Sequence, residues 1–507
     1  MINKIFEVIK GYSKLSIFYL IALIFLSLLL ESLSLGLLIP VIGYFSSPEF
    51  SEIINLQKVF YLLPDFEVPR KKFFNFFLSV ILIFFTLRFI FSTYLTLKLH
   101  SFIGSSTKII CEKLLGIYVS KDYKWHTNFN KSDFLHILTR DVENFTANTL
   151  YGFLFIVSEI FLFFGVIIFL LFFNAKVFLN LVIISAIFFP ALYYFTKKVS
   201  VNLGKKVIDN QSKMLKGVNE SLSGIKELIL YSWSEKVKKH FKKTIDPLVK
   251  AYALHNSLQD ISRFVLEFVA VLLFLIFIFT LSINENGQNS ILTIGIFAAA
   301  LFRLMPIMNR LSTYAQRLRY GSGSTDKILD FYNYETKIKD INDTIDINFK
   351  ENLVFKNIGF KYNKSQNNII NNINFEIGKN EIVGIIGESG VGKTTLSNII
   401  MGLLIPTEGE IIVDGKNLIK NNLTIKNSIA FVPQNFFHID ASLLENITFF
   451  DENVSLSDLK FAIKNSLLIK PIIEKNLSLK TRMGNQAMKI SGGQLQRVNI
   501  ARALYRR

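Results

Sequence analysis

The chain has 507 residues, of which 50% are hydrophobic and 50 are phenylalanine, and its mean hydropathy of +0.37 is too high for an ordinary soluble protein of two or three domains. The formal net charge is +18, which in a chain with long apolar runs indicates basic loops on a membrane protein and not a nucleic-acid partner. The single cysteine, Cys111, excludes an intrachain disulfide.

Six apolar stretches in the first two thirds of the chain are long enough to cross a membrane. A hydrocarbon core about 30 Å thick requires roughly 20 apolar residues in a helix. Because no small-residue cleavage site follows the first run, we interpret it as a retained span and not as a signal peptide. The predicted spans are Leu15–Phe45, Phe73–Leu97, Phe145–Phe173, Val177–Phe195, Phe264–Ile283 and Ile291–Met308.

The connections between the predicted spans differ in length and charge. The links after the second and fourth spans, Lys98–Asn144 and Lys197–Arg263, are long and rich in lysine. Basic excess marks the cytoplasmic side, so both long links and both termini are predicted to face the cytosol, although the link after the first span also carries the basic cluster Arg70–Lys72. Apolar residues continue at helical spacing into the long links, which predicts helical legs that extend well beyond the bilayer.

Ionisable residues within the predicted spans are few, and each is costly in hydrocarbon. They are expected to face the bundle interior or a wet cavity. Two interpretations remain open: they pair with one another as fixed struts, for instance Glu31 with Arg88 or Arg303, or they line a path for a charged or polar solute. The set comprises Glu31, Arg88, Glu159, Glu267 and Arg303.

The apolar density falls between Tyr320 and Lys350, which predicts a linker that is entered by a helix over Ser324–Tyr334. Beyond the linker, Leu353–Phe360 and Ile373–Ile377 alternate like half-buried strands. A soluble domain is therefore predicted to begin here.

The stretch Gly387–Thr395, GESGVGKTT, fits the pattern G-x-x-x-x-G-K-[ST]. It follows the apolar run Glu381–Ile386, a predicted buried strand, and precedes a predicted helix over Leu396–Leu404. Glycines let successive backbone N–H groups point at one anion, and a helix N-terminus adds partial positive charge. In such a loop Lys393 reaches the β- and γ-phosphates and the Thr394 hydroxyl ligates Mg²⁺. A glycine-rich turn with a chance lysine is the alternative, but the strand and helix predicted around it favour binding of a nucleoside triphosphate.

A second string, Ser491–Gln494, also opens a predicted helix and makes a second N-terminus suited to an anion. Together the two motifs resemble those of the ATP-binding cassette (ABC) transporters, and six spans before one nucleotide domain resemble their exporter branch. The resemblance implies that Ser491–Gln494 contacts the γ-phosphate held by an opposite subunit, so that two copies clamp two ATP molecules. It also implies that Tyr362 stacks on adenine and that Gln434 senses Mg²⁺ and the attacking water.

Further roles follow from the same resemblance. Lys121–Phe129 and Gly224–Ile229 look like the short coupling helices that dock on nucleotide domains, while Leu301–Arg310 and Glu31–Pro40 resemble bacterial flippases for lipid-linked oligosaccharides. Thr394 and Gln434 are the expected Mg²⁺ ligands. The residues expected to bind nucleotide are Tyr362, Gly387, Glu388, Ser389, Gly390, Val391, Gly392, Lys393, Thr394, Thr395, Gln434, Ser491, Gly492, Gly493 and Gln494.

Two features depart from the family pattern. Asn485 stands where the family usually has a glutamate that forms a cross-domain salt bridge. The sequence ends at Arg507, before the segment in which the family carries its Mg²⁺-anchoring aspartate, general-base glutamate and γ-phosphate-sensing histidine. We therefore expect no catalytic base in this chain, and weak ATP binding without turnover.

The predicted fold class is an α-helical membrane bundle of six transmembrane helices followed by an incomplete α/β P-loop domain. The expected boundaries are 1–322 for the membrane domain, 323–350 for the linker and 351–507 for the nucleotide domain. We interpret the chain as a homodimeric half-transporter of the bacterial inner membrane, with both termini cytoplasmic, that uses ATP and Mg²⁺ to export or flip a lipid-linked or amphiphilic substrate. Its expected partners are a second copy, that substrate and membrane lipids, but no nucleic acid. The alternatives are a peptide or drug exporter and a truncated fragment that binds ATP without hydrolysing it.

Overall fold

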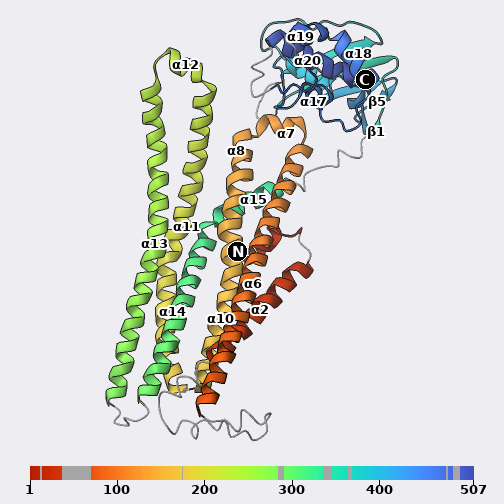
Figure 1. Ribbon diagram of the computed structural model, residues 1–507. Coiled ribbons are helices and arrows are strands. Elements are labelled where there is room, and N and C mark those ends of the chain that lie inside the picture. The colour runs from red at the N-terminus through yellow and green to blue at the C-terminus, as the bar shows by residue number, and fades with distance from the viewer. Residues whose placement is uncertain are drawn as a thin grey trace. The chain divides into compact units, whose positions relative to one another are not determined.

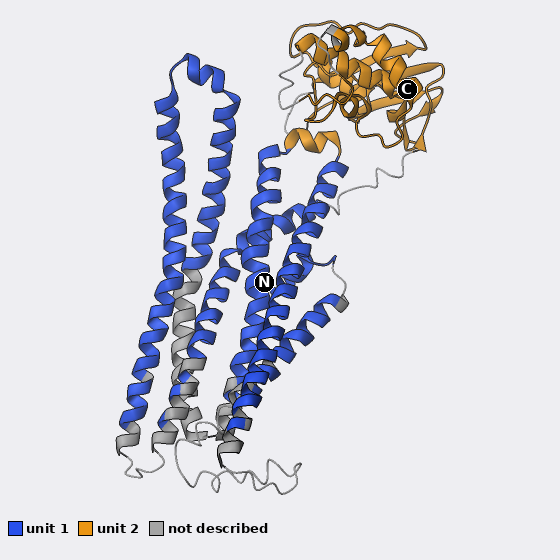
Figure 2. Cartoon of the chain, viewed as in Figure 1, with its two compact units in different colours: residues 1–121, 129–338 blue, residues 122–128, 339–507 orange. Residues whose placement is uncertain are grey.

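The structure is a computed structural model, and it describes residues 1–11, 14–36, 70–173, 175–283, 290–334, 345–362, 368–474, 478–483 and 491–506. The chain divides into two compact units, which Figure 2 shows in different colours. Unit 1 comprises residues 1–121 and 129–338, and unit 2 comprises residues 122–128 and 339–507. Unit 2 therefore combines the C-terminal third of the chain with one short segment from far earlier in the sequence.

Unit 1 is built from long helices that lie side by side (Figure 1). Six of those that the structure describes contain the predicted spans, and three of the six, with 51, 49 and 50 residues, are about twice as long as a bilayer requires. The prediction that the helices continue beyond the predicted spans is thus confirmed. By length and composition, Leu78–Ser120, Lys131–Gly165 and Ser234–Phe279 qualify as membrane spans among the described residues. The six helices are α2 (Lys14–Gly36), α6 (Arg70–Ser120), α10 (Tyr151–Phe173), α11 (Ala175–Ser223), α13 (Ser234–Ile283) and α14 (Ser290–Tyr320).

Parts of the predicted spans and turns, residues 37–45, 174 and 284–286, lie outside the described residues. Where the helices are described, apolar side chains join them. Phe277 of α13 and Ile307 of α14 are buried in one cluster, and Val207 of α11 and Leu248 of α13 are buried in another. In both clusters, unit 1 is therefore held together by the packing of helix on helix.

Short helices connect the long ones at the ends of the legs. Between α6 and α10, one leg contains α8 (Lys131–His136) and α9 (Val142–Asn144), with the π-helical segments η1 (Ile137–Asp141) and η2 (Phe145–Leu150) on either side of α9. The short helix α7 (Tyr123–Asn128), which belongs to unit 2, comes before this leg in the chain. In the other leg, α12 (Ile225–Leu230) joins α11 to α13. The chain leaves α14 through α15 (Ser322–Tyr332), which lies two residues earlier than the predicted Ser324–Tyr334 helix.

The N-terminal helix α1 (Ile2–Val8) packs within unit 1. Ile5 and Val8 are buried, and Lys4 Nζ lies 2.7 Å from Asp326 Oδ1 of α15. The apolar side of this helix therefore faces protein at these two positions.

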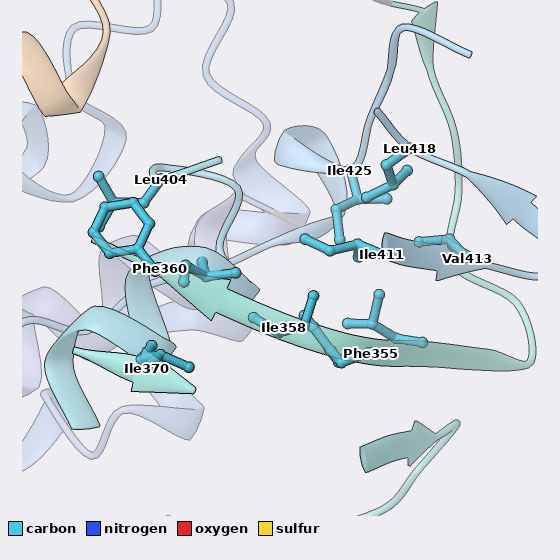
Figure 3. Close-up of a cluster of buried hydrophobic side chains, with 11 residues drawn as sticks. Phe355, Ile358, Phe360, Ile370, Leu404, Ile411, Val413, Leu418 and Ile425 are labelled. Carbon is cyan, nitrogen blue, oxygen red and sulfur yellow. The ribbon is translucent and has the colours of Figure 1, made fainter. Parts of the chain in front are cut away.

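In the nucleotide part of unit 2, four antiparallel strands form one sheet, in the order β3-β2-β4-β5. β1 (Ile345–Asp346) and β6 (Leu423–Thr424) pair in parallel beside it. Figure 3 shows the apolar side chains of the core, including Phe355, Phe360 and Val413, which are at most 1% exposed. The sheet strands are β2 (Asn352–Phe360), β3 (Ile370–Gly378), β4 (Glu408–Val413) and β5 (Lys416–Asn417), so the two strands predicted around residues 353–360 and 373–377 are confirmed.

The predicted buried strand over Glu381–Ile386 is wrong. The segment forms no strand, and Ile382 and Ile386 are 99% and 94% exposed. An apolar run becomes a buried strand only where neighbouring strands pair with its backbone and cover its faces, and the described sheet ends with β3 and β5 at its edges.

The remaining helices make a second subdomain with its own core. Leu443, Leu459 and Val498 are buried together there. Ser442 caps the first helix and forms a reciprocal capping box with Glu445, which fixes where that helix begins. The helices are α17 (Leu443–Thr448), α18 (Leu456–Asn465), α19 (Ile469–Glu474) and α20 (Gly492–Tyr505), while α16 (Lys393–Ile400) and the 3₁₀ turn η5 (Lys426–Ser428) belong to the sheet side.

Candidate nucleotide-binding site

The loop Gly387–Thr395 leads directly into α16, as the motif predicts, although the helix begins at Lys393 and ends at Ile400, three and four residues before the predicted bounds. Gly390 and Gly392 have φ of +88° and +104°. Residues with a Cβ rarely adopt this left-handed region, so the loop can take its path only with glycine at these places. A Cβ on Gly392 would also lie 3.1 Å from Ile369 Cγ2.

The Lys393 side chain folds back over the loop. Its Nζ donates to the backbone oxygens of Gly387 and Glu388, at 2.7 Å each. The ammonium therefore lies beside the glycines of the loop, at the N-terminus of α16, where an anion gains from both the cation and the helix dipole. Thr394 is exposed at the same end of the helix, while Thr395 is buried and anchors it.

Tyr362 packs against the sheet core of unit 2. It follows β2, and its ring meets the buried ring of Phe360 edge-on at 5.0 Å between centroids. The backbone N–H of Ile369 donates to Phe360 O at 2.8 Å, and Ile369 is the residue that a Cβ on Gly392 would touch. Ile369 thus bonds to the end of β2 and also lies against the glycine loop.

Ser491–Gln494 opens α20, and side chains of the motif cap the backbone N–H groups of Ser491 and Gln494. Ser491 is the N-cap: its hydroxyl accepts from Gln494 N at 3.4 Å, and Gln494 Oε1 accepts from Ser491 N at 2.9 Å. A Cβ on Gly492 or Gly493 would meet no atom within 4 Å. The structure therefore gives Gln494 a capping contact that sequence reasoning missed, although the S-x-x-Q spacing is itself a signal for it.

The two glycine-containing motifs rest on different cores. Ile399 of α16 belongs to the sheet core, whereas Val498 of α20 belongs to the core of the helical subdomain. Gln434 lies exposed in an irregular segment after Val432 and Pro433. Asn485 lies outside the described residues.

Both predicted coupling segments form short helices. α7 belongs to the nucleotide unit, where Lys124 Nζ lies 5.7 Å from the centroid of the Phe360 ring. α12 ends with exposed apolar side chains, with Ile229 72% and Leu230 75% exposed. Apolar surface of this kind normally marks a contact site for another protein surface.

One ion pair between α10 and α14 is not predicted from the sequence. Arg310 of α14 donates through Nε to Glu159 Oε1 at 2.6 Å and through Nη2 to Oε2 at 3.0 Å. Arg310 lies two residues beyond the last predicted span, so it was not considered as a partner. Glu267 pairs with Arg263 on its own helix at 2.8 Å. The side chains of Glu31 and Arg303 lie outside the described residues, and Arg88 lies 5.7 Å from the Phe85 ring centroid.

Comparison with known proteins agrees with this arrangement of helices and site. The family model for the ABC transporter transmembrane region matches residues 15–305, and the family model described as ABC transporter matches residues 370–507. The first match alone covers more than half of the chain. The chain belongs to the ABC transporter family, as a multi-pass membrane protein of the exporter type with a nucleotide-binding domain in the same polypeptide.

Similar proteins are known in sequence and in structure. An ATP-dependent lipid A-core flippase of Cupriavidus pinatubonensis is 26% identical over 338 residues, which are 64% of this chain and 57% of that protein. A protein with the same name from Francisella tularensis is 28% identical over 317 residues, 60% of this chain and 51% of its own. The chain therefore spans little more than half the length of these relatives. A solved structure of a bacterial Atm1-family ABC exporter with ATP bound superposes with a TM-score of 0.77 at 16% identity, covering 97% of this chain and 83% of the other.

Proposed function

We propose that this chain is one half of an ATP-driven exporter or flippase that moves a lipid-linked or otherwise amphiphilic molecule across the bacterial inner membrane. The observation that carries the proposal is the Lys393 ammonium, held by two loop carbonyls at the N-terminus of α16. A cation beside left-handed glycines at a helix N-terminus is the arrangement that binds an anion well. The loop lies in a polypeptide whose other unit consists of membrane-length helices.

The roles at the nucleotide are inferred from the family motifs. The exposed Thr394 hydroxyl is suited to bind Mg²⁺, with Gln434 as a second ligand and sensor of the attacking water. Tyr362 would stack its ring on adenine. Gly387–Thr395 wraps the phosphates, and Ser491–Gln494 offers a capped helix end to a γ-phosphate.

A homodimer explains why the two motifs rest on separate cores. If each loop served a different nucleotide, the signature helix of one copy would complete the site of the other. The exposed apolar residues at the end of α12, Ile229 and Leu230, would then dock on a nucleotide domain. Burial of two such side chains contributes about 1.5–3 kcal/mol each.

The substrate class is inferred from the relatives. Two proteins similar over the larger part of this chain are named lipid A-core flippases, so we expect an amphiphile with a saccharide head and acyl chains. The orientation, with both termini cytoplasmic, is inferred from the lysines of the two long links. These links form the legs of the structure.

Transport in sealed vesicles tests the proposal. The purified chain is reconstituted with a fluorescent lipid-linked oligosaccharide, a labelled peptide or a cationic dye, and ATP-dependent movement is measured for wild type and Lys393→Ala. Lys416→Ala is the matched control, because Lys416 is an exposed lysine of β5 outside the loop.

The proposal requires wild type and the Lys416 variant to move the saccharide lipid and the Lys393 variant to move nothing. The ATP binding without turnover that the sequence analysis expects would instead give no movement in any of the three. Movement of the peptide or dye alone would establish the rival exporter class. Nucleotide binding without movement of any probe would favour the binding-only alternative.

A further inference from the structure

A buried polar cluster in unit 1 shares no residue with the candidate nucleotide-binding site. At its centre is Asp141, which is 1% exposed. His136 Nδ1 lies 2.9 Å from Asp141 Oδ2, and because a carboxylate only accepts, the imidazole donates here. Ser324 Oγ donates to Asp141 Oδ1 at 2.8 Å, and Lys327 Nζ lies 3.9 Å from Oδ2. Both carboxylate oxygens are thus engaged.

The cluster joins two segments that are far apart in sequence. His136 and Asp141 lie on α8 and η1, the leg that continues directly from α7, and α7 belongs to the nucleotide unit. Ser324 and Lys327 lie on α15, the last helix before the chain re-enters that unit. Asp141 therefore links two segments: α8–η1, which follows the first passage of the chain through the nucleotide unit, and α15, which precedes its return to that unit.

Neighbouring contacts reinforce the same junction. Phe134 stacks on Tyr118 at 4.1 Å and lies 5.4 Å from Phe331 of α15 between ring centroids. Lys121 Nζ donates to the backbone oxygen of Tyr334. The last residue of unit 1 before α7 is thus bonded to the last described residue before the linker.

Burying a charged group in this place needs a reason beyond stability. Apolar residues of similar size usually stabilise a core as well as a buried ion pair or better. Here the polar groups fix how α15 packs against the α8–η1 leg. This leg departs from α-helical geometry in the π-helical segments η1 and η2. Single π-helical turns often mark functional positions in helices. The Nε2 atom of His136 is buried and has no hydrogen-bond partner among the described residues. Among those residues, the imidazole therefore bonds through Nδ1 to Asp141.

We propose that Asp141, with Ser324 as its partner across the junction, is the coupling residue that makes α15 and the α8–η1 leg move as one body when nucleotide binds. The inference rests on the proposed function, because it assumes that nucleotide binding drives a movement of the membrane helices. Asp141 and Ser324 act as positioning residues and touch neither nucleotide nor substrate.

The chain contains a reporter for this movement. Cys111, its only cysteine, is half-buried on α6, and its Sγ lies 3.9 Å from the backbone oxygen of Leu138 in η1. A shift of η1 along α6 would change the access of a maleimide to this thiol. The wild-type sequence can therefore be labelled without engineering.

The test compares the labelling rate of Cys111 in the full chain in lipid nanodiscs, with and without Mg²⁺ and a non-hydrolysable ATP analogue. The variants are Ser324→Ala and Asp141→Asn. Ser322→Ala is the matched control, because Ser322 Oγ bonds only to Arg319 O nearby in the chain in the described contacts. Binding of a fluorescent ATP analogue and circular dichroism are measured in parallel, so that loss of coupling is separated from loss of folding.

In wild type and the Ser322 control, the analogue should change the labelling rate about fivefold or more, the lower end of typical coupling between linked sites. In Ser324→Ala and Asp141→Asn the nucleotide should bind unchanged while the rate change is lost. An unchanged response in Ser324→Ala would overturn the inference, as would wild type that binds nucleotide without any response at Cys111. Wild type that binds no nucleotide would refute the proposed function, and the inference with it.

Discussion

The pair between Glu159 and Arg310 allows a quantitative prediction, because its two members are buried to different extents. The Glu159 side chain is 7% exposed and the Arg310 side chain is 43% exposed. Arg310→Gln leaves a buried carboxylate without its partner, which typically costs about 3–5 kcal/mol. Glu159→Gln keeps an acceptor and leaves a half-exposed guanidinium, so the loss is nearer the value of one charged hydrogen bond, about 1.5–3 kcal/mol.

The double variant completes a cycle. Once the carboxylate is gone, loss of Arg310 removes little more, so the double variant should be less destabilised than the sum of the two single variants. Coupling between residues in contact is about 0.5–3 kcal/mol. The assay is the apparent midpoint of thermal unfolding in one lipid–detergent mixture, followed by circular dichroism, with Arg263→Gln as a control, since Arg263 forms an exposed pair within its own helix. The reasoning fails if Glu159→Gln lowers the midpoint as much as Arg310→Gln, or if the two effects add.

Three further substitutions test local geometry. Gly392→Ala places a Cβ at φ +104°, which should cost about 1–3 kcal/mol and weaken binding of a fluorescent ATP analogue, whereas Gly402→Ala, at φ +66° outside the loop, should leave that affinity unchanged. Gly321→Ala would put a Cβ 2.3 Å from Thr149 Oγ1 and should lower the unfolding midpoint by overpacking worth about 1–3 kcal/mol; an unaltered midpoint would show that α15 can shift. Ser491→Ala removes an N-cap worth about 0.5–2 kcal/mol, so amide exchange in the first turn of α20 should quicken while Ser491→Thr stays near wild type.

Features set by local rules were predictable from the sequence. The six helices follow from apolar runs whose length depends only on the bilayer. The path of Gly387–Thr395 follows from a backbone that only glycine can adopt, and the structure places Gly390 and Gly392 in that conformation. The helix at Ser491 follows from its capping spacing.

Features set by distant partners were not predictable. The run Glu381–Ile386 has the composition of a buried strand, but burial depends on neighbours that local composition does not reveal, and Ile382 is 99% exposed. Glu159 and Arg310 are 151 positions apart, and only the packing of α10 on α14 brings them together. Asp141 stands in a polar link where a carboxylate is normally solvated, so nothing in its surroundings indicated burial.

The passage of the chain into the nucleotide unit has a consequence for how this protein can be altered. The backbone crosses between the units at residues 121/122, 128/129 and 338/339, so α7 is a piece of the nucleotide unit carried on the membrane unit's leg. A chimera that replaces residues 339–507 alone would set a foreign surface against Lys124, which lies over the Phe360 ring. The interchangeable module is therefore residues 122–128 together with 339–507, and grafts that respect this division should retain their fit where a simple C-terminal exchange loses it.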